Sequence, residues 1–182
     1  MSRFTSFDPN AELGGATAVS FLTNINHENI EQILKKHHLD DIKLDQWYPL
    51  QSVLNVMSDI SEGMDYSANF VAIGLEAGVL GTKMLPPSMA NMSIAEFMVA
   101  YEQIYHTRHR GNAGYLKTEQ LSDSHVRIVT CMPYPDDVCY GVFFAYARHF
   151  CPPNKRFTIV YDTDHQNRDD GGAETIYHIY IK

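Results

Sequence analysis

The sequence predicts a single α+β domain, in which a helical N-terminal half packs on a four-stranded antiparallel sheet with one inserted helix. Up to about residue 105, apolar residues recur at helical spacing, and prolines and glycines separate the segments. After Gly111 the apolar residues alternate along the chain, as they do in strands, apart from one further helical segment. A chain of 182 residues has the usual size of one domain, so we expect the domain to span residues 1–182, with residues 1–25 as an N-terminal extension.

Helices in the N-terminal half are expected at residues 26–38, 49–61 and 66–80, and from residue 93 onward. Asn26 is a suitable N-cap for the first of them, and Pro49 suits the first turn of the second. Ser93 and Glu96 form a capping box, in which each side chain accepts a hydrogen bond from the other residue's backbone N–H, and this box starts the fourth helix. Residues 16–22 could form either an edge strand or the start of a helix, and the sequence leaves this open.

Strands are expected at residues 114–120, 126–132, 156–162 and 174–181, and the inserted helix at residues 138–150. The first two strands form a hairpin. Residues 133–137, with two prolines, form a rigid turn that can cap the inserted helix. Residues 168–172, Arg-Asp-Asp-Gly-Gly, form a polar turn directly before the closing strand, which is rich in β-branched and aromatic residues.

The charge and composition of the chain exclude some classes of partner. The formal net charge is -8, and no run of Lys or Arg is long enough to follow a phosphate backbone, so we expect neither nucleic acid nor an anionic membrane surface as a partner. The chain has 11 Tyr, 9 Phe and 8 Met, which offer adaptable apolar surface for an internal pocket. No apolar stretch is long enough to cross a membrane, and the N-terminus lacks the apolar segment of a secretory signal. We therefore expect a soluble cytoplasmic protein.

Candidate metal ligands do not form a recognised pattern. The three cysteines have no CxxC pair, and we interpret them as buried free thiols: Cys131, Cys139 and Cys151. His106 and His109 lie near the end of the fourth helix beside Arg108 and Arg110, whose positive charge repels a divalent cation. We interpret this cluster as a solvated C-terminal cap or as a contact for an anion, and we expect no metal site.

Several short segments resemble those of one superfamily: Trp47–Leu50, Arg110–Gly111, Pro133–Pro135, Tyr140–Val142, and Asp169–Gly172 followed by Tyr177–Ile179. Together with the order of helices, hairpin, proline-rich turn, helix, strand, Gly-Gly loop and terminal strand, they make residues 26–182 similar to the 4-vinyl reductase domain. That domain shares its fold with haem-NO-binding (H-NOX) domains and with small TRAPP vesicle-tethering subunits. The resemblance implies a sensor fold that holds a small hydrophobic ligand between its helices and its sheet.

This sequence departs from the superfamily at two kinds of site. Zinc-containing members look to have Cys near the last loop and strand, where this chain has His165, Asn167, Ala173 and Thr175. We therefore expect no analogous zinc site. H-NOX members hold haem through a His on the helix before the sheet, but here no His occurs between His38 and His106. Only His106, at a helix end, would remain for haem, so no cofactor is predicted as the main interpretation.

The functional hypothesis is a non-catalytic sensory or ligand-binding domain with a small hydrophobic molecule in an internal cavity. The expected lining is apolar and aromatic, with the two tyrosines as polar anchors: Met57, Phe70, Ile73, Phe97, Tyr101, Tyr105 and Phe143. A signalling protein is the expected downstream partner, and a homodimer the expected assembly.

Three alternatives stay open. The first is a haem or tetrapyrrole protein that uses His106 or His109. The second is a TRAPP-like scaffold subunit, which would have an extended apolar surface. The third is an enzyme acting on a hydrophobic substrate, although no paired acid and base residues can be assigned.

Overall fold

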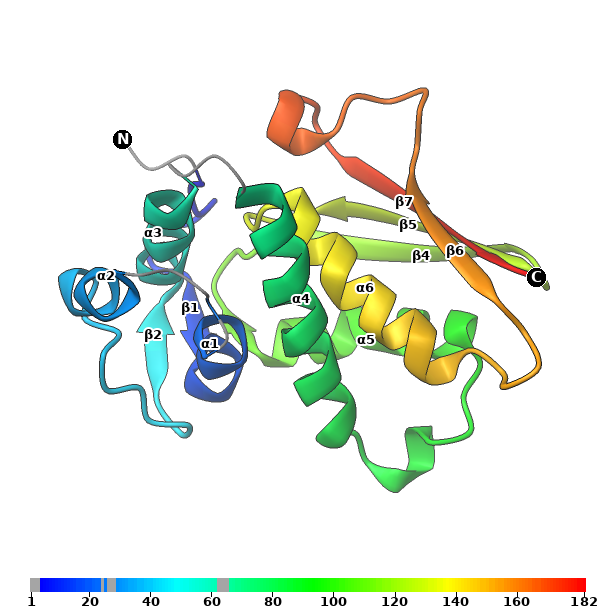
Figure 1. The fold of residues 1–182 in the computed structure, drawn as a ribbon, viewed down its shortest axis with the longest axis horizontal. Helices are drawn as coiled ribbons and strands as arrows, with labels where there is room; N and C mark the ends of the chain where they lie inside the picture. The colour runs from blue at the N-terminus through cyan, green and yellow to red at the C-terminus, as the bar shows by residue number, and fades with distance from the viewer. Residues whose placement is uncertain (1–3, 24, 26–28, 62–65) are drawn as a thin grey trace.

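Helices and strands segregate along the chain in the computed structural model, which describes residues 4–23, 25, 29–61 and 66–182. Among these residues there are six α-helices and two antiparallel sheets, and this confirms the predicted α+β class. Figure 1 shows the N-terminal elements gathered on one side and the C-terminal sheet on the other, with two long helices between them. Asn26, the expected N-cap, lies outside the described residues.

A small three-stranded sheet ties the N-terminal segment to the middle of the chain. It contains β1 (Glu12–Gly14), β2 (Trp47–Pro49) and β3 (His109–Arg110), in the order β2-β1-β3. Leu13 pairs with Tyr48 on one side and with His109 on the other, and it is fully buried. These strands are not predictable from the sequence, because two or three residues are too few to show an alternating pattern.

The N-terminal helices surround this small sheet: α1 (Gly15–Leu22), α2 (Ile30–Lys36) and α3 (Leu50–Ile60). The open alternative at residues 16–22 is therefore decided in favour of a helix. Pro49 is the last residue of β2, and α3 begins directly after it. The apolar side chains of α3 are buried: Leu50, Val53, Leu54, Val56, Met57 and Ile60.

The C-terminal sheet has the predicted four antiparallel strands: β4 (Tyr115–Ser122), β5 (His125–Cys131), β6 (Phe157–Tyr161) and β7 (Thr175–Ile181). Their order is β4-β5-β7-β6, so the closing strand of the chain lies inside the sheet and not at its edge. Tyr177 and Ile179 on β7 are fully buried. The central position of β7 explains why its sequence is so rich in apolar and β-branched residues.

Three longer helices complete the fold: α4 (Tyr66–Lys83), α5 (Ile94–Thr107) and α6 (Asp136–Phe150). The capping box predicted for α5 is present, because Ser93 N donates to Glu96 Oε2 over 2.8 Å and Glu96 N donates to Ser93 Oγ over 3.2 Å. α6 is the predicted inserted helix, and it crosses in front of the C-terminal sheet beside α4 (Figure 1). Within the described residues, none of these helices combines the length and the apolar character that a membrane crossing needs.

Glycines allow α4 and α6 to approach each other very closely. A Cβ atom at Gly74 would lie 2.0 Å from the carbonyl oxygen of Val138, and one at Gly141 would lie 2.2 Å from that of Val71. Both distances are far below van der Waals contact, so each position accepts only glycine at this separation of the helices. The backbone contact holds the two helices as one rigid layer over the sheet.

The polar turn before the closing strand is anchored to the start of α6. It contains a short 3₁₀ helix, η2 (Arg168–Asp170). Asp136 N donates to the carboxylate of Asp169 over 2.9 Å, and Asp169 N donates to the carboxylate of Asp136 over 2.9 Å. Thr175 Oγ1 also donates to Asp136 Oδ1, over 2.7 Å, and an Arg168 guanidinium nitrogen donates to the carbonyl of Met132. These contacts fix the helix, the turn and β7 relative to one another.

Candidate functional site

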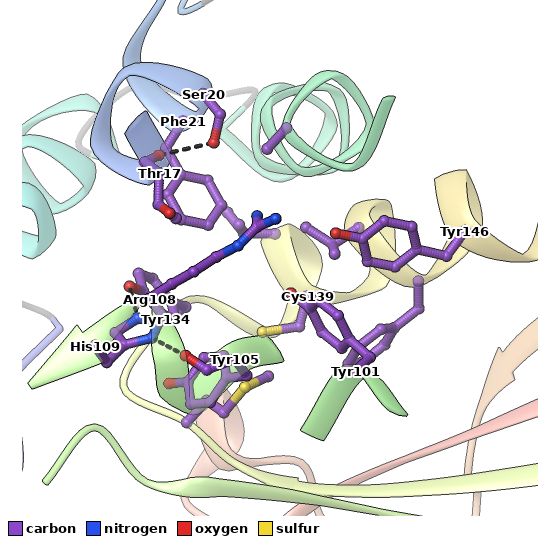
Figure 2. A pocket seen from close by; sticks show the side chains of 15 residues that line it. Thr17, Ser20, Phe21, Tyr101, Tyr105, Arg108, His109, Tyr134, Cys139 and Tyr146 are labelled. Atoms are coloured by element: carbon purple, nitrogen blue, oxygen red, sulfur yellow. Dashed lines mark hydrogen bonds between the residues drawn. The ribbon is translucent and has the colours of Figure 1, made fainter. Parts of the chain in front are cut away.

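A small pocket lies where α1, α4, α5 and α6 meet the turn after β5 (Figure 2). We call it the inner pocket, and its lining consists of Thr17, Ser20, Phe21, Ala77, Tyr101, Tyr105, Arg108, His109, Met132, Tyr134, Val138, Cys139, Val142, Phe143 and Tyr146. Its free volume is about 30 Å³, which leaves room for little more than a water molecule. Aromatic side chains fill most of the space between the helices.

A wider cleft opens beside the inner pocket, and we call it the outer cleft. Its lining consists of Gly14, Ala16, Thr17, Ser20, Leu44, Asp45, Gln46, Trp47, Gly81, Met84, Thr107 and Arg108. Its free volume is about 320 Å³, at the lower end of the range of small-molecule sites. Thr17, Ser20 and Arg108 line both cavities, so the inner pocket and the outer cleft meet at these three side chains.

The floor of the inner pocket is a hydrogen-bonded chain through His109. His109 Nδ1 lies 2.7 Å from the carbonyl oxygen of Tyr105, and Nε2 lies 2.7 Å from the hydroxyl of Tyr134. Tyr105 in turn donates its hydroxyl hydrogen to the carbonyl of Ala113 over 2.5 Å. Because a carbonyl oxygen only accepts, Nδ1 carries the hydrogen, and Nε2 is left to accept from Tyr134.

Burial keeps His109 neutral. The side chain is 9% exposed, and burial lowers its pKa from 6.5 to about 4, against the opposing effect of the hydrogen bond to the Tyr105 carbonyl. The positive charge of Arg108 nearby acts in the same direction as burial. At neutral pH the imidazole is therefore uncharged, and its single lone pair is directed at the Tyr134 hydroxyl.

The opposite wall of the inner pocket is aromatic. Tyr101 and Tyr146 have ring centroids 4.8 Å apart, and Tyr101 also contacts Phe143 edge to face at 6.4 Å. Burial raises the pKa of both tyrosines, and the positive charge of Arg108 opposes this rise. Both phenols are therefore neutral at physiological pH, and the wall offers π-faces and hydroxyl groups without charge.

Arg108 lies at the junction of the two cavities. Figure 2 shows its side chain extended from the end of α5 into the space between α1 and α6. Its backbone is held at both ends, because Arg108 N donates to the Tyr105 carbonyl over 3.1 Å and the Arg108 carbonyl accepts from Gly14 N over 3.0 Å. From the sequence, the cluster around Arg108 was expected to be a solvated cap or an anion contact. A solvated cap is wrong for His109, because the contacts of β3 with β1 bury it.

The residues predicted to line a cavity divide into two groups. Tyr101, Tyr105 and Phe143 do line the inner pocket. The other four lie in the hydrophobic core and are not part of this lining: Met57, Phe70, Ile73 and Phe97. His106 is exposed at the end of α5 and is not part of the lining either.

Other lining residues could not be selected from the sequence pattern. Thr17 and Ser20 belong to a segment whose secondary structure the sequence left open, and Arg108 lies outside any periodic stretch. Tyr134 lies in the proline-rich turn that carries part of the resemblance, and this was its only signal.

Metal-ligating groups are sparse in this region. Cys131, Cys139 and Cys151 are free thiols, and burial raises the pKa of Cys139 well above its ordinary value. In the part of the chain that the structure describes, no three His, Cys, Asp or Glu side chains are grouped so that they could hold a metal ion. The described site therefore offers one neutral imidazole, one guanidinium and several neutral phenols.

Sequence comparisons find no match, either to a protein-family model or to a curated protein. Structural comparisons do. A mutant H-NOX of T. tengcongensis matches with a TM-score of 0.72 at 12% identity, over 93% of this chain and 98% of the other. A mutant H-NOX protein from K. algicida, in an Fe(II) unliganded form, matches with a TM-score of 0.67 at 12% identity, over 93% of this chain and 97% of the other.

A third similar structure is an oxygen-binding H-NOX domain related to soluble guanylate cyclases, in its oxygen complex. Its TM-score is 0.68 at 12% identity, over 92% of both chains. These matches show that the chain has the fold of H-NOX domains over nearly its whole length. They support the H-NOX part of the resemblance in the sequence, whereas the likeness to 4-vinyl reductase domains and TRAPP subunits stays a prediction.

Proposed function

We propose that this chain is a ligand-binding sensor domain that holds a small, largely apolar molecule between its N-terminal segment and its C-terminal half. The observation that carries the proposal is the pair of connected cavities, one wide and one nearly filled by aromatic side chains. Clefts between structural units, lined by aromatic and apolar side chains with a few polar groups, are the usual form of small-molecule sites.

The position of the cavities suits a sensor. The outer cleft is lined by α1 and β2 on the N-terminal side and by α4 and the end of α5 on the other. A molecule in the cleft therefore contacts both sides at once. A ligand shifts a conformational equilibrium only through contacts that differ between the two states, and contacts across such a junction have this property.

The size of the cavities indicates where a ligand would lie. The outer cleft, with about 320 Å³, accommodates a single ring or a short chain, whereas the inner pocket, with about 30 Å³, does not. We therefore place the body of the ligand in the outer cleft, next to the inner pocket. In the same proposal the domain does not catalyse a reaction, acts in the cytoplasm through a downstream signalling protein, and forms a homodimer.

Native mass spectrometry of the full chain, purified from its own host, tests this proposal. We expect a mass excess over the sequence mass that disappears on denaturation, together with the mass of a dimer. A protein that carries no small molecule, and that shows no saturable binding of apolar compounds, would contradict ligand binding. A monomer with a bound small molecule would remove only the homodimer.

Haem binding is the second candidate, because the structures with the same fold include an Fe(II) H-NOX protein and a protein used to probe heme distortion in the H-NOX family. The residues of the inner pocket do not fit that group as they are arranged. Among the described residues His109 is the only imidazole in the lining, and its one lone pair accepts the hydroxyl hydrogen of Tyr134. His106 is exposed at the end of α5. A free volume of about 30 Å³ also leaves no space for a porphyrin.

Optical spectroscopy distinguishes the two candidates. We expect the purified protein to be colourless, and added haemin to give no saturable Soret band. A stoichiometric Soret band that is lost in a His109→Ala variant, but kept in a His106→Ala variant, would establish haem binding through His109. The reverse pattern would assign the iron to His106.

A further inference from the structure

We infer that Arg108 is the binding group for a carboxylate, so that the ligand of this domain is a small apolar carboxylic acid. The inference rests on the proposed function, because it names the chemical class of the molecule in the outer cleft. Four features of the described residues carry it: the position of Arg108, its lack of an acidic partner, the hydroxyl groups beside it, and the apolar walls of the cleft.

The guanidinium of Arg108 is directed into the site by the backbone. Arg108 follows the last turn of α5 and precedes β3, and hydrogen bonds to Tyr105 and from Gly14 fix its main chain on both sides. The side chain is half-buried and lines both cavities. Its charge therefore lies where a molecule in the outer cleft would meet the inner pocket (Figure 2).

This cation has no acidic partner within the described residues. The ion pairs of the described part of the chain include those of Arg110 with Glu12 and of Arg127 with Glu119, but none with Arg108. Of the residues that the structure describes, Asp45 alone is acidic in the lining of the two cavities, and it is exposed. A half-buried guanidinium without a carboxylate gains more from an incoming anion than an exposed, already paired one does.

Other groups around Arg108 suit a carboxylate. The hydroxyl of Ser20 donates to the Thr17 carbonyl over 2.7 Å, whereas the Thr17 hydroxyl has no bonding partner among the described residues and can donate to a ligand. His109 stays neutral because burial lowers its pKa to about 4, so the imidazole does not compete as a second cation. A carboxylate at this point would receive hydrogen bonds from the guanidinium and from one hydroxyl.

The rest of the outer cleft suits an apolar group. Leu44, Trp47 and Met84 line it, and two of them are highly exposed, with 65% of Leu44 and 62% of Met84 accessible. A ligand that covers such side chains gains roughly 25 cal/mol for each Å² of apolar surface removed from water. The site therefore combines one cation with an apolar cleft, which is the pattern that binds a short fatty acid or an aromatic acid.

Matched acids and alcohols test the inference on the full chain. Trp47 is the only tryptophan and lines the outer cleft, so its fluorescence reports occupancy. The probes are octanoate with 1-octanol, and phenylacetate with 2-phenylethanol, because each pair differs only in the charged group. We expect the acid of at least one pair to bind about tenfold more tightly than its alcohol, as a charge-assisted hydrogen bond predicts. The pair with the larger difference in affinity between acid and alcohol indicates whether the ligand of this domain is an alkyl or an aromatic acid.

Three variants assign the preference to Arg108. Arg108→Gln should bind the acid no better than the alcohol, while Arg108→Lys should keep the preference for the acid at reduced affinity. Arg148→Gln is the matched control, because Arg148 is exposed on α6 and lines neither cavity. Circular dichroism should show that all three variants stay folded. If Arg108→Gln does not fold, Thr17→Val provides the second test, because it removes the hydroxyl that would donate to the carboxylate and should weaken the preference for the acid.

The outcomes separate this inference from the proposed function. If alcohols bind as tightly as acids, in the natural protein and in Arg108→Gln alike, the inferred binding of a carboxylate by Arg108 is overturned, and the binding of an apolar ligand stands. If no acid binds while the protein from its host carries a neutral molecule, the carboxylate is again overturned. If no probe binds and the host protein carries nothing, both proposals are overturned.

Discussion

The hydroxyl of Tyr134 lies 2.7 Å from Nε2 of His109 and donates its hydrogen to the lone pair of this nitrogen. The two residues come from the turn before α6 and from β3, so this contact joins the C-terminal half to the small N-terminal sheet. It withholds the imidazole nitrogen from any ligand in the pocket.

Removal of the Tyr134 hydroxyl should make His109 more basic. In a Tyr134→Phe variant Nε2 loses its donor, so the neutral imidazole is less stabilised and its pKa rises above the present value of about 4. An NMR titration of the His109 ring protons measures the change. Tyr140→Phe is the control, because Tyr140 donates to Ile159 at 3.1 Å, away from His109, and should leave that pKa unchanged. An unchanged His109 pKa in Tyr134→Phe would contradict the assigned direction of the hydrogen bond.

The buried His109 should make the protein less stable in mild acid. Its pKa is about 4 in the folded protein and 6.5 when exposed, so the unfolded chain binds the proton more readily. Stability is therefore fully present above pH 6.5 and is lost as the pH falls toward 4, by about 3 kcal/mol at 1.36 kcal/mol per pKa unit.

Urea unfolding at several pH values measures this loss. A His109→Gln variant should lose less stability between pH 6.5 and 4 than the natural protein. His149→Gln, on the exposed face of α6, should keep the natural pH dependence. Equal slopes for all three proteins would show that His109 is not the group that responds.

Thr175 should be important for stability, because its hydroxyl serves two partners at the start of β7. It donates to Asp136 Oδ1 over 2.7 Å and accepts from Arg168 N over 2.9 Å, and the side chain is fully buried. Thr175→Val keeps the shape but leaves both partners unsatisfied, so we expect a loss of about 2 kcal/mol. Chemical denaturation measures the change. Thr158→Val on the exposed part of β6 is the control and should change stability by less than about 0.5 kcal/mol.

The close contact of α4 with α6 should tolerate no side chain at Gly74. A methyl group there would lie 2.0 Å from the Val138 carbonyl, so Gly74→Ala must push the helices apart. We expect a loss of stability of about 3 kcal/mol or more, visible as a lower thermal unfolding midpoint. Gly14→Ala is the matched control, because a methyl group at Gly14 meets its nearest atom only at 3.6 Å. Equal midpoints for the two variants would contradict the rigid backbone contact.

Most of the secondary structure could be predicted because it depends on local patterns of apolar and polar residues. Apolar residues at helical spacing gave α3, α4 and α5, and alternation gave the hairpin, β6 and β7. The capping box at Ser93 and Glu96 fixed the start of α5. Such signals depend only on neighbours along the chain, so they survive in the sequence alone.

The site could be predicted only in part, for a physical reason that its residues illustrate. Tyr101 and Tyr105 could be chosen because they lie on the apolar face of a helix. Arg108 and His109 could be assigned only to a cluster that was either a solvated cap or an anion contact, with His109 as one possible haem ligand. Their burial depends on pairing with β1, almost a hundred residues earlier in the chain.

By itself, then, the sequence determined the α+β class, the four strands of the C-terminal sheet and the helices that cover it. Tertiary structure decided which side chains face a cavity and how much space is left between them. It also decided that the Tyr134 hydroxyl, rather than a ligand, is hydrogen-bonded to Nε2 of His109. Secondary structure follows from the periodicity of single segments. A pocket is the space left by several segments after packing, and this space depends on contacts that no single segment encodes.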